Sequence, residues 1–238
     1  MSIYDLVRFS HPLLIANEGD EKYWVGQNGT CFVVQRSSRL FAIMARHCVT
    51  PSSAGHLLIA CLDREFAPLL AGYQRTLERT IEEDEQDLYI VEVDRSRMST
   101  KYRSALRYID LPSDVPYEQL NLNPESELCI PGFPKDRAIL DYDAKVFHPK
   151  PTVLAATYVR RSKEFGCHEI KFYDNRVAAP SLDGFSGSPV YYFPKKDGIR
   201  YWSFVGMLLR GHGSKGRFLD ATVIARGIDN IIKYNPWG

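Results

Sequence analysis

Short apolar runs separated by turn-forming residues follow one another along most of the chain. Several are rich in Val, Ile, Phe and Tyr, which fit a half-buried strand, and are bounded by Gly, Pro, Asn or Asp. The runs are Cys31–Gln35, Leu40–Met44, His56–Leu62, Leu88–Val93, Leu128–Ile130, Val153–Tyr158, Val190–Phe193, Trp202–Leu209 and Phe218–Ile224. This pattern predicts an all-β fold, either a barrel or a sandwich.

Helix signals are sparser. Ile224–Tyr234 predicts a short C-terminal helix, because its four isoleucines fall near one helical face and Pro236 stops it. Phe66–Glu85 has a helix-compatible composition, but Pro68 and Gly72 argue against a helix there. That segment can equally form a long strand–turn–strand excursion.

A proline-rich stretch divides the chain into two halves. Leu111–Glu127 contains three prolines among Ser, Asn and Asp, which is typical of a surface connection. A chain of 238 residues is long enough for one large all-β domain or two small ones. We therefore expect an N-terminal domain over 1–115 and a C-terminal domain over 116–238.

Composition excludes several classes of partner and site. The chain has 30 basic and 29 acidic residues, a formal net charge of +1, so we expect no nucleic-acid partner and no attraction to anionic membranes. Long apolar segments and the pattern of a secretory signal are missing, which predicts no membrane span. The adjacent pairs His47-Cys48 and Cys167-His168 lack zinc-ligand spacing, so we expect no metal.

Cysteine usage points to a reducing compartment. The odd number of cysteines and the absence of a CxxC pair predict free thiols and a cytoplasmic protein. They are Cys31, Cys48, Cys61, Cys129 and Cys167.

The segment Gly184–Val190, with the sequence GFSGSPV, is the first candidate for chemistry. Its glycines allow a tight turn whose amides point at one spot, and such a turn can hold the Ser186 hydroxyl beside two N–H donors. A plain Ser/Gly turn that enters a strand is an equally good interpretation of this segment alone.

A serine nucleophile needs a base, and a base needs a carboxylate to orient it. His47 directly follows the apolar run that ends near Met44, where a strand end would hold it rigidly. Asp87 opens the strand pattern Leu88–Val93 and can accept the second ring N–H of the histidine. Asp84 is a weaker alternative because it lies three residues further from that strand.

Together these segments resemble the trypsin/chymotrypsin-like serine peptidases. ARHC, ending at Cys48, is similar to the family's Ala-Ala-His-Cys, DLYIV from Asp87 to its Asp-Ile-Ala-Leu-Leu, and GFSGSPV to its Gly-Asp-Ser-Gly-Gly-Pro-Val. The order His, Asp, Ser is the family's order, with separations of 40 and 99 residues. GTCFVV from Gly29 is similar to a strand of the bacterial Deg/HtrA-like branch, and FVGM from Phe204 to the strand after the nucleophile.

The resemblance implies two packed six-stranded antiparallel β-barrels with a short C-terminal helix. His47 and Asp87 would come from the first barrel and Ser186 from the second, as a catalytic triad that hydrolyses peptide bonds without a cofactor. The amides of Gly184 and Ser186 would form the oxyanion hole.

The resemblance also implies where the substrate binds. A protein or peptide substrate would pair with the strand Leu208, Leu209, Arg210 and Gly211. By family position, Pro180 lies near the base of the specificity pocket and Phe218 near its wall, which favours small or apolar side chains at the cleavage point.

Three departures from the family pattern bear on activation. Phe185 replaces the acid that in trypsin binds a newly cut N-terminus, so we expect no trypsin-style activation and allow for a separately encoded activator. Ser188 replaces a glycine, which relatives tolerate. Cys48 matches one half of a family disulfide, but Cys31 is a loose match for the other half.

Two rival functions remain to be compared with the peptidase. A latent or inactive protease-like fold that acts as a binding or sensor protein fits if Phe185 holds the oxyanion loop inactive. An α/β-hydrolase would need Ser186, Asp197 and His212 as its triad, but Ser186 lies too near the C-terminus for that fold.

Overall fold

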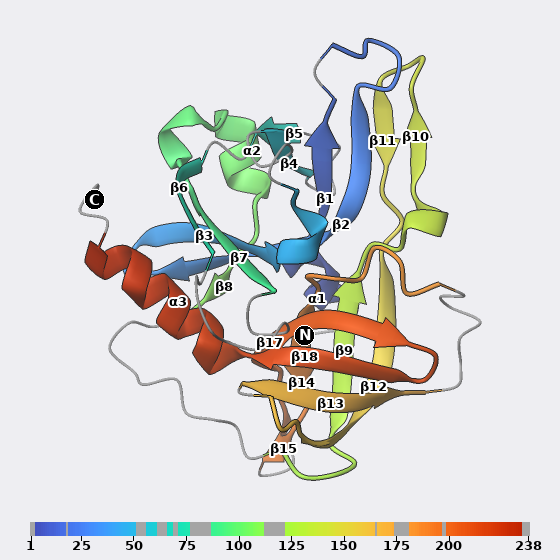
Figure 1. Cartoon of the computed structure of the whole chain (residues 1–238), viewed down its shortest axis with the longest axis vertical. Coiled ribbons are helices and arrows are strands. Elements are labelled where there is room, and N and C mark those ends of the chain that lie inside the picture. Colours follow the sequence, from blue (N-terminus) through green and yellow to red (C-terminus); the bar gives the residue numbers. More distant parts are fainter. Residues whose placement is uncertain are drawn as a thin grey trace.

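The computed structural model consists of an N-terminal β-sheet and a C-terminal β-barrel, with one helix at the C-terminal end (Figure 1). It describes residues 3–17, 19–50, 56–60, 66–68, 71–76, 87–111, 122–164, 166–173, 181–196 and 199–234. Pro180, Asp84, Asp197 and Cys61, named above, lie outside these ranges, as does most of the predicted proline-rich connection.

Eight strands form the N-terminal sheet, in the order β5-β4-β1-β2-β3-β7-β6, with β8 paired to β2. Their bounds are Ser10–Ala16 (β1), Val25–Arg36 (β2), Arg39–Ala45 (β3), Leu57–Ala60 (β4), Phe66–Pro68 (β5), Ala71–Thr76 (β6), Leu88–Val93 (β7) and Ile109–Asp110 (β8). Two short helices accompany these strands: Ile3–Leu6 (α1) precedes β1, and Thr100–Ala105 (α2) lies between β7 and β8. The side chain of Ser99 caps α2 by accepting a hydrogen bond from the amide of Tyr102.

The C-terminal half forms a closed six-stranded antiparallel barrel, in the order β12-β13-β18-β17-β14-β9. Its strands are Glu127–Gly132 (β9), Thr152–Arg161 (β12), Cys167–Phe172 (β13), Pro189–Tyr192 (β14), Ser203–His212 (β17) and Lys215–Asp220 (β18). Two small hairpins accompany it, β10 (Ile139–Asp141) with β11 (Val146–His148), and β15 (Lys195–Lys196) with β16 (Ile199–Arg200). Alternate residues of the barrel strands fill its interior.

Elements of the second half pack against the first sheet. The helix Ala221–Tyr234 (α3) buries Ile224, Ile228 and Ile231 in the same core as the N-terminal strands. Arg36 at the end of β2 donates two hydrogen bonds to the Asp229 carboxylate of α3, at 2.5 and 2.8 Å. The β10–β11 hairpin lies beside β1 and β2 in Figure 1 and contributes Phe147 to a core cluster with N-terminal residues.

The predicted all-β class, the C-terminal barrel and the C-terminal helix are confirmed. The first half departs from the expected six-stranded antiparallel barrel, because its described residues form an eight-stranded sheet with one parallel pair, β2 with β8. Within Phe66–Glu85 the strand alternative is correct for β5 and β6. The division at residue 115 stays a prediction.

Candidate active site

Adjacent strands bring His47 and Asp87 together. In the antiparallel pairing of β3 and β7, Ala45 lies opposite Leu88, so the residues after β3 meet the residue before β7. The chain then turns through the 3-10 segment Arg46–Cys48, whose first amide donates to the Asp87 carbonyl at 3.1 Å. The register of two strands, 40 residues apart in sequence, therefore sets this pair.

The Asp87 carboxylate holds His47 at two points. Its Oδ1 accepts a hydrogen bond from the His47 backbone amide at 2.9 Å. His47 Nδ1 lies 2.9 Å from Oδ1 and 2.7 Å from Oδ2 of the same carboxylate. Asp87 is 8% exposed, whereas the His47 side chain is about half exposed and lines a pocket. Nδ1 is thus committed to the carboxylate, which orients the ring.

This contact changes the acidity of the imidazole. The hydrogen bond to Asp87, with a smaller contribution from the Cys48 side chain, raises the pKa of His47 to about 10, against the opposing effect of burial. At any pH below this raised pKa, the protonated His47 ring is therefore the favoured form. A general base must pass through that form when it takes a proton from a hydroxyl group.

Ser186 lies in a tight turn between the two halves. The turn is fixed by hydrogen bonds from the Phe185 amide to the Leu182 carbonyl at 3.1 Å and from the Ser188 amide to the Phe185 carbonyl at 2.9 Å. Gly184 and Gly187 adopt φ values of +94° and +87°, which residues with a side chain rarely adopt. The glycines that flank the serine are thus required by the backbone.

Thr30 of β2 connects this turn to the N-terminal sheet. Its amide donates to the Ser186 carbonyl at 3.0 Å, and its hydroxyl donates to the Gly184 carbonyl at 2.6 Å. The same hydroxyl accepts a hydrogen bond from the Phe133 amide at 3.0 Å. Thr30 is fully buried, so these bonds are shielded from water. In the sequence, Thr30 stands out only as part of the GTCFVV segment, and that segment does not reveal this role.

One pocket of about 340 Å³ gathers the candidate residues. His47 from the first half and Gly184 and Ser186 from the second all line it. No hydrogen bond between the His47 and Ser186 side chains is present among the described residues. Such contacts are often long until a substrate binds.

The backbone amides of Gly184 and Ser186 belong to residues that line this pocket. Within the described part of the chain, neither amide donates a hydrogen bond to another protein group, whereas the amides of Phe185, Gly187 and Ser188 all do. Two unsatisfied donors two residues apart, beside a serine hydroxyl, are the arrangement that can stabilise a developing oxyanion.

The predicted substrate residues divide into two groups. Arg210 and Gly211 line the pocket. Leu208 does not, since its side chain is in the barrel core and its amide and carbonyl bond to Ser188 and Gly187. Leu209 is fully buried in the core shared with the first half. The backbone of Leu208 is therefore not available to pair with a substrate strand, and such pairing is possible only at residues after Leu208.

The assignment of Phe218 to a pocket wall does not fit the structure. Its side chain is fully buried inside the barrel and stacks on His168 with ring centroids 4.7 Å apart. The alternation of β18 points Phe218 inward, and the family position alone did not reveal this.

Other pocket residues were not predicted. Asn28 donates from Nδ2 to the Cys48 carbonyl at 2.5 Å, and Lys135 donates to Asn28 Oδ1 at 3.5 Å. Leu182 and Asp183 complete the lining with Cys48. Apart from Cys48, which stands in ARHC, these residues carry no motif, and only the folding of distant segments brings them together.

The cysteines of the described residues are free thiols. A Cβ placed on Gly29 would lie 2.9 Å from the Cys48 sulfur, so Gly29 occupies the position that faces Cys48. Cys31 lies two residues further along β2 and is not the missing partner.

A second histidine–aspartate pair has a structural role. His168 Nε2 lies 2.9 Å from Asp220 Oδ2, and both residues are buried. Burial alone would raise the pKa of Asp220, but hydrogen bonds with His168 and Thr222 outweigh it and lower the pKa. The other ring nitrogen of His168, Nδ1, lies 3.4 Å from the Tyr158 hydroxyl. His212 of the rival esterase triad does not line the Ser186 pocket.

Comparisons with known proteins define the fold. No family model and no curated protein sequence matches the chain. A solved structure of a mutant of human heparin binding protein (CAP37) aligns with a TM-score of 0.63 and 13% identity, over 96% of this chain and 92% of that chain. Human heparin binding protein itself aligns with a TM-score of 0.60 and 13% identity over the same shares. The chain has a chymotrypsin-like fold.

A chymotrypsin-like fold alone does not establish activity. The matched structures are named for binding heparin, and at 13% identity the likeness carries the fold and no function. Among the described helices, none has the length and apolar composition to cross a membrane. Groups of three or more metal-ligating side chains are likewise absent from the described residues.

Proposed function

We propose that this protein is a serine endopeptidase that uses His47, Asp87 and Ser186. The observation that carries the proposal is the pocket in which an Asp87-bound His47 meets Ser186 beside two unsatisfied amides. Each of these groups has one part in acyl transfer, and they come from segments that only the fold brings together.

The residues divide the reaction as in serine peptidases generally. His47 Nε2 accepts the Ser186 hydroxyl proton as Oγ attacks the scissile carbonyl carbon. The amides of Gly184 and Ser186 bind the negative oxygen of the tetrahedral intermediate. His47 then gives its proton to the leaving amine, and water hydrolyses the acyl-enzyme by the same steps in reverse. Asp87 stabilises the protonated ring at both stages.

Packing supports an oxyanion loop that is set without a cut N-terminus. Phe185 is fully buried in the barrel core, and a Cβ on Gly132 would lie 2.6 Å from its ring. An aromatic side chain held there anchors the loop through apolar contact. A separately encoded activator remains part of the proposal as a source of regulation, and the buried free thiols support a cytoplasmic location.

Cleavage of a peptide library tests the peptidase. We expect the purified protein to cleave a subset of the library and the Ser186→Ala variant to cleave none. Ser188→Ala is the matched control, because it removes a neighbouring buried hydroxyl that has no hydrogen-bond partner among the described residues. Cleavage that survives in Ser186→Ala, or that Ser188→Ala abolishes equally, would refute Ser186 as the nucleophile.

Binding without catalysis is the second candidate. Human heparin binding protein, which shares the fold, is named for a ligand and not for a reaction. A groove rich in Lys and Arg beside the candidate site favours an anionic ligand for this chain as well. A protein that binds such a ligand and cleaves no library member would support this alternative.

A further inference from the structure

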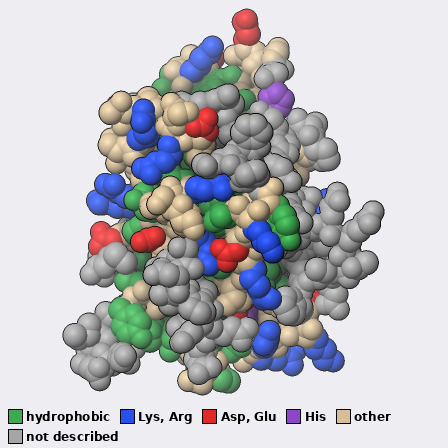
Figure 2. All heavy atoms as spheres, turned by 90° about the vertical axis from the view of Figure 1, so that its left-hand side faces the viewer, with side chains coloured by type: hydrophobic (Ala, Val, Ile, Leu, Met, Phe, Trp, Pro, Cys, Tyr) green, Lys and Arg blue, Asp and Glu red, His purple; other side chains and the backbone are tan. Residues whose placement is uncertain are grey.

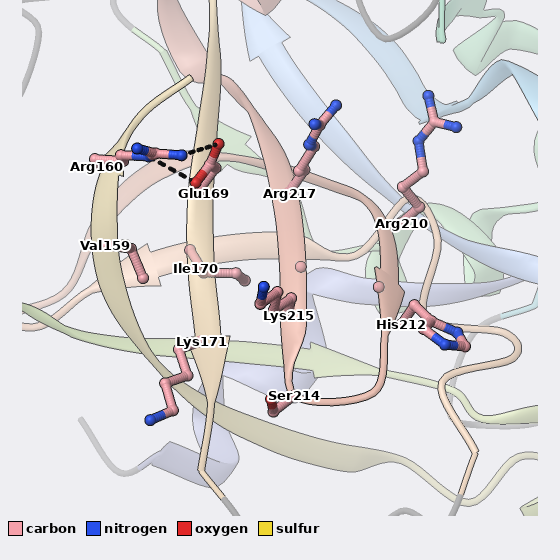
Figure 3. Close-up of a pocket in the computed structure, with 12 residues that line it drawn as sticks. Val159, Arg160, Glu169, Ile170, Lys171, Arg210, His212, Ser214, Lys215 and Arg217 are labelled. Carbon is pink, nitrogen blue, oxygen red and sulfur yellow. Dashed lines mark hydrogen bonds and ion pairs between the residues drawn. The ribbon is translucent and has the colours of Figure 1, made fainter. Parts of the chain in front are cut away.

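A basic groove lies on the C-terminal barrel, over β12, β13, β18 and β17 (Figure 3). It has a volume of about 770 Å³. Its lining residues include one acid, Glu169, and five cations, which are Arg160, Lys171, Arg210, Lys215 and Arg217. On the face shown in Figure 2, by contrast, Lys and Arg are scattered with Asp and Glu between several of them.

Two of the cations are neutralised within the chain. Arg160 donates to both oxygens of Glu169, at 2.8 and 3.3 Å. Arg217 pairs at 2.6 Å with Glu164, which lies outside the groove. The pKa of Glu169 is lowered first by Arg160 and further by Arg217 and Lys215. The carboxylate of Glu169, the single acid of the groove, is therefore already paired with Arg160.

The two lysines of the groove place like charges at opposite positions of paired strands. In the antiparallel pairing of β13 with β18, Lys171 lies directly opposite Lys215, so both side chains project from the same face. Both are exposed, and neither has an ion pair with a described residue. Like charges opposite each other destabilise a sheet, and a bound anion would relieve the repulsion.

The groove shares two lining residues with the pocket of the candidate active site. Arg210 and Gly211 line both the groove and the pocket of His47 and Ser186. An occupant that reaches both must therefore be extended, which fits a peptide chain better than a compact anion.

We propose that the groove binds an acidic segment of the peptide substrate, next to the bond that Ser186 attacks. The proposal rests on the proposed peptidase function and adds its substrate class. Lys171 and Lys215 supply the charge that recognises Asp or Glu side chains, and the shared residues Arg210 and Gly211 place that segment beside the cleaved bond. The proposed preference is thus an acidic determinant next to the cleavage point.

Peptide binding to the uncleaving Ser186→Ala protein tests this directly. The probes are a fluorescent peptide with a run of Glu and a matched peptide with Gln in its place, compared by anisotropy at low and high salt. We expect the Glu peptide to bind more tightly, and its affinity to fall as salt rises. Lys171→Gln/Lys215→Gln should weaken it about five-fold, as two exposed charge pairs imply.

The control removes the same charge elsewhere. Lys150 and Lys163 are exposed and lie outside the groove, so Lys150→Gln/Lys163→Gln should leave the affinity unchanged. Equal affinity for the Glu and Gln peptides, or equal weakening in both double variants, would overturn the groove proposal. Tighter binding of a heparin oligosaccharide than of the Glu peptide, lost in Lys171→Gln/Lys215→Gln, would overturn it in favour of a sulfated polyanion.

A different experiment shows whether the peptidase proposal fails. It would appear as the absence of library cleavage by the wild-type protein, whereas the groove proposal depends on binding by a variant that needs no activity. If both hold, the cleaved library members should be enriched in Asp and Glu, and the enrichment should fall in Lys171→Gln/Lys215→Gln.

Discussion

The state of one proton on His47 governs the proposed chemistry. Asp87 raises the pKa of His47, so the ring is protonated over a wider pH range than a free histidine. A protonated ring cannot accept the Ser186 proton, so activity should rise as the pH approaches the raised pKa and more of the ring is neutral. The same carboxylate that orients the base thus moves its working range towards alkaline pH.

The rate at which a fluorophosphonate probe labels the protein should follow this titration. We expect the rate to rise with pH, with its midpoint above 6.5, the ordinary pKa of histidine. Asp87→Asn should lower the rate and move the midpoint down, because the partner that favours the imidazolium is lost. The measurement is the second-order labelling rate across the pH range. A midpoint at or below 6.5 in the wild type would contradict the role given to Asp87.

At the scale of elements, β2 supports the nucleophile loop through Thr30. The Thr30 hydroxyl donates to the Gly184 carbonyl and accepts from the Phe133 amide. The Thr30 backbone amide donates to the Ser186 carbonyl. A strand of the first half thus fixes a loop of the second half at the point where the oxyanion amides must be aligned.

Removal of the Thr30 hydroxyl should slow acylation while the fold persists. Thr30→Val keeps the shape and leaves the Phe133 amide buried without its acceptor, a loss of about 1–3 kcal/mol. If this free energy is lost from the alignment of the Ser186 loop, the rate of probe labelling should fall about 10-fold or more. Thr30→Ser should restore most of the rate. Far-UV spectra and the pH midpoint of labelling should stay unchanged, because His47 is untouched. A Thr30→Val rate equal to that of the wild type would remove Thr30 from the account.

Sequence patterns predicted the elements whose two faces differ. Short apolar runs coincide with five of the six barrel strands but missed β13, and the isoleucines of α3 mark its buried face. The parallel pairing of β8 with β2 was not found, because β8 has two residues and is held by a partner 75 positions away. Local pattern carries no signal for such a pairing.

At the scale of the whole molecule, the candidate site was predicted as far as motifs reach. His47, Asp87 and Ser186 stand in recognisable segments, and the fold brings His47 to Asp87 and to the Ser186 pocket. Asn28 and Lys135 carry no motif, and the segment that contains Thr30 gave no sign of its role. These roles depend on contacts between residues about 100 or more positions apart or on the pocket itself. Phe218 was misplaced because a family position does not fix which face of a strand a side chain takes.

The two halves also determine the site together. α3 and the β10–β11 hairpin, both from the second half, pack on the first sheet, and Arg36 binds Asp229 across that contact. Because His47 and Ser186 come from opposite sides of this packing, the pocket between them depends on it. An activator that changed the packing would act on the distance between base and nucleophile without touching either.

Identification of the residue modified by a fluorophosphonate probe tests the central claim most directly. The purified wild-type protein is labelled, digested and sequenced by mass spectrometry, with Ser186→Ala treated in parallel. The account predicts modification at Ser186 in the wild type and none in the variant. Modification at another residue, or none at all at alkaline pH where His47 is neutral, would contradict a working His47–Asp87–Ser186 site.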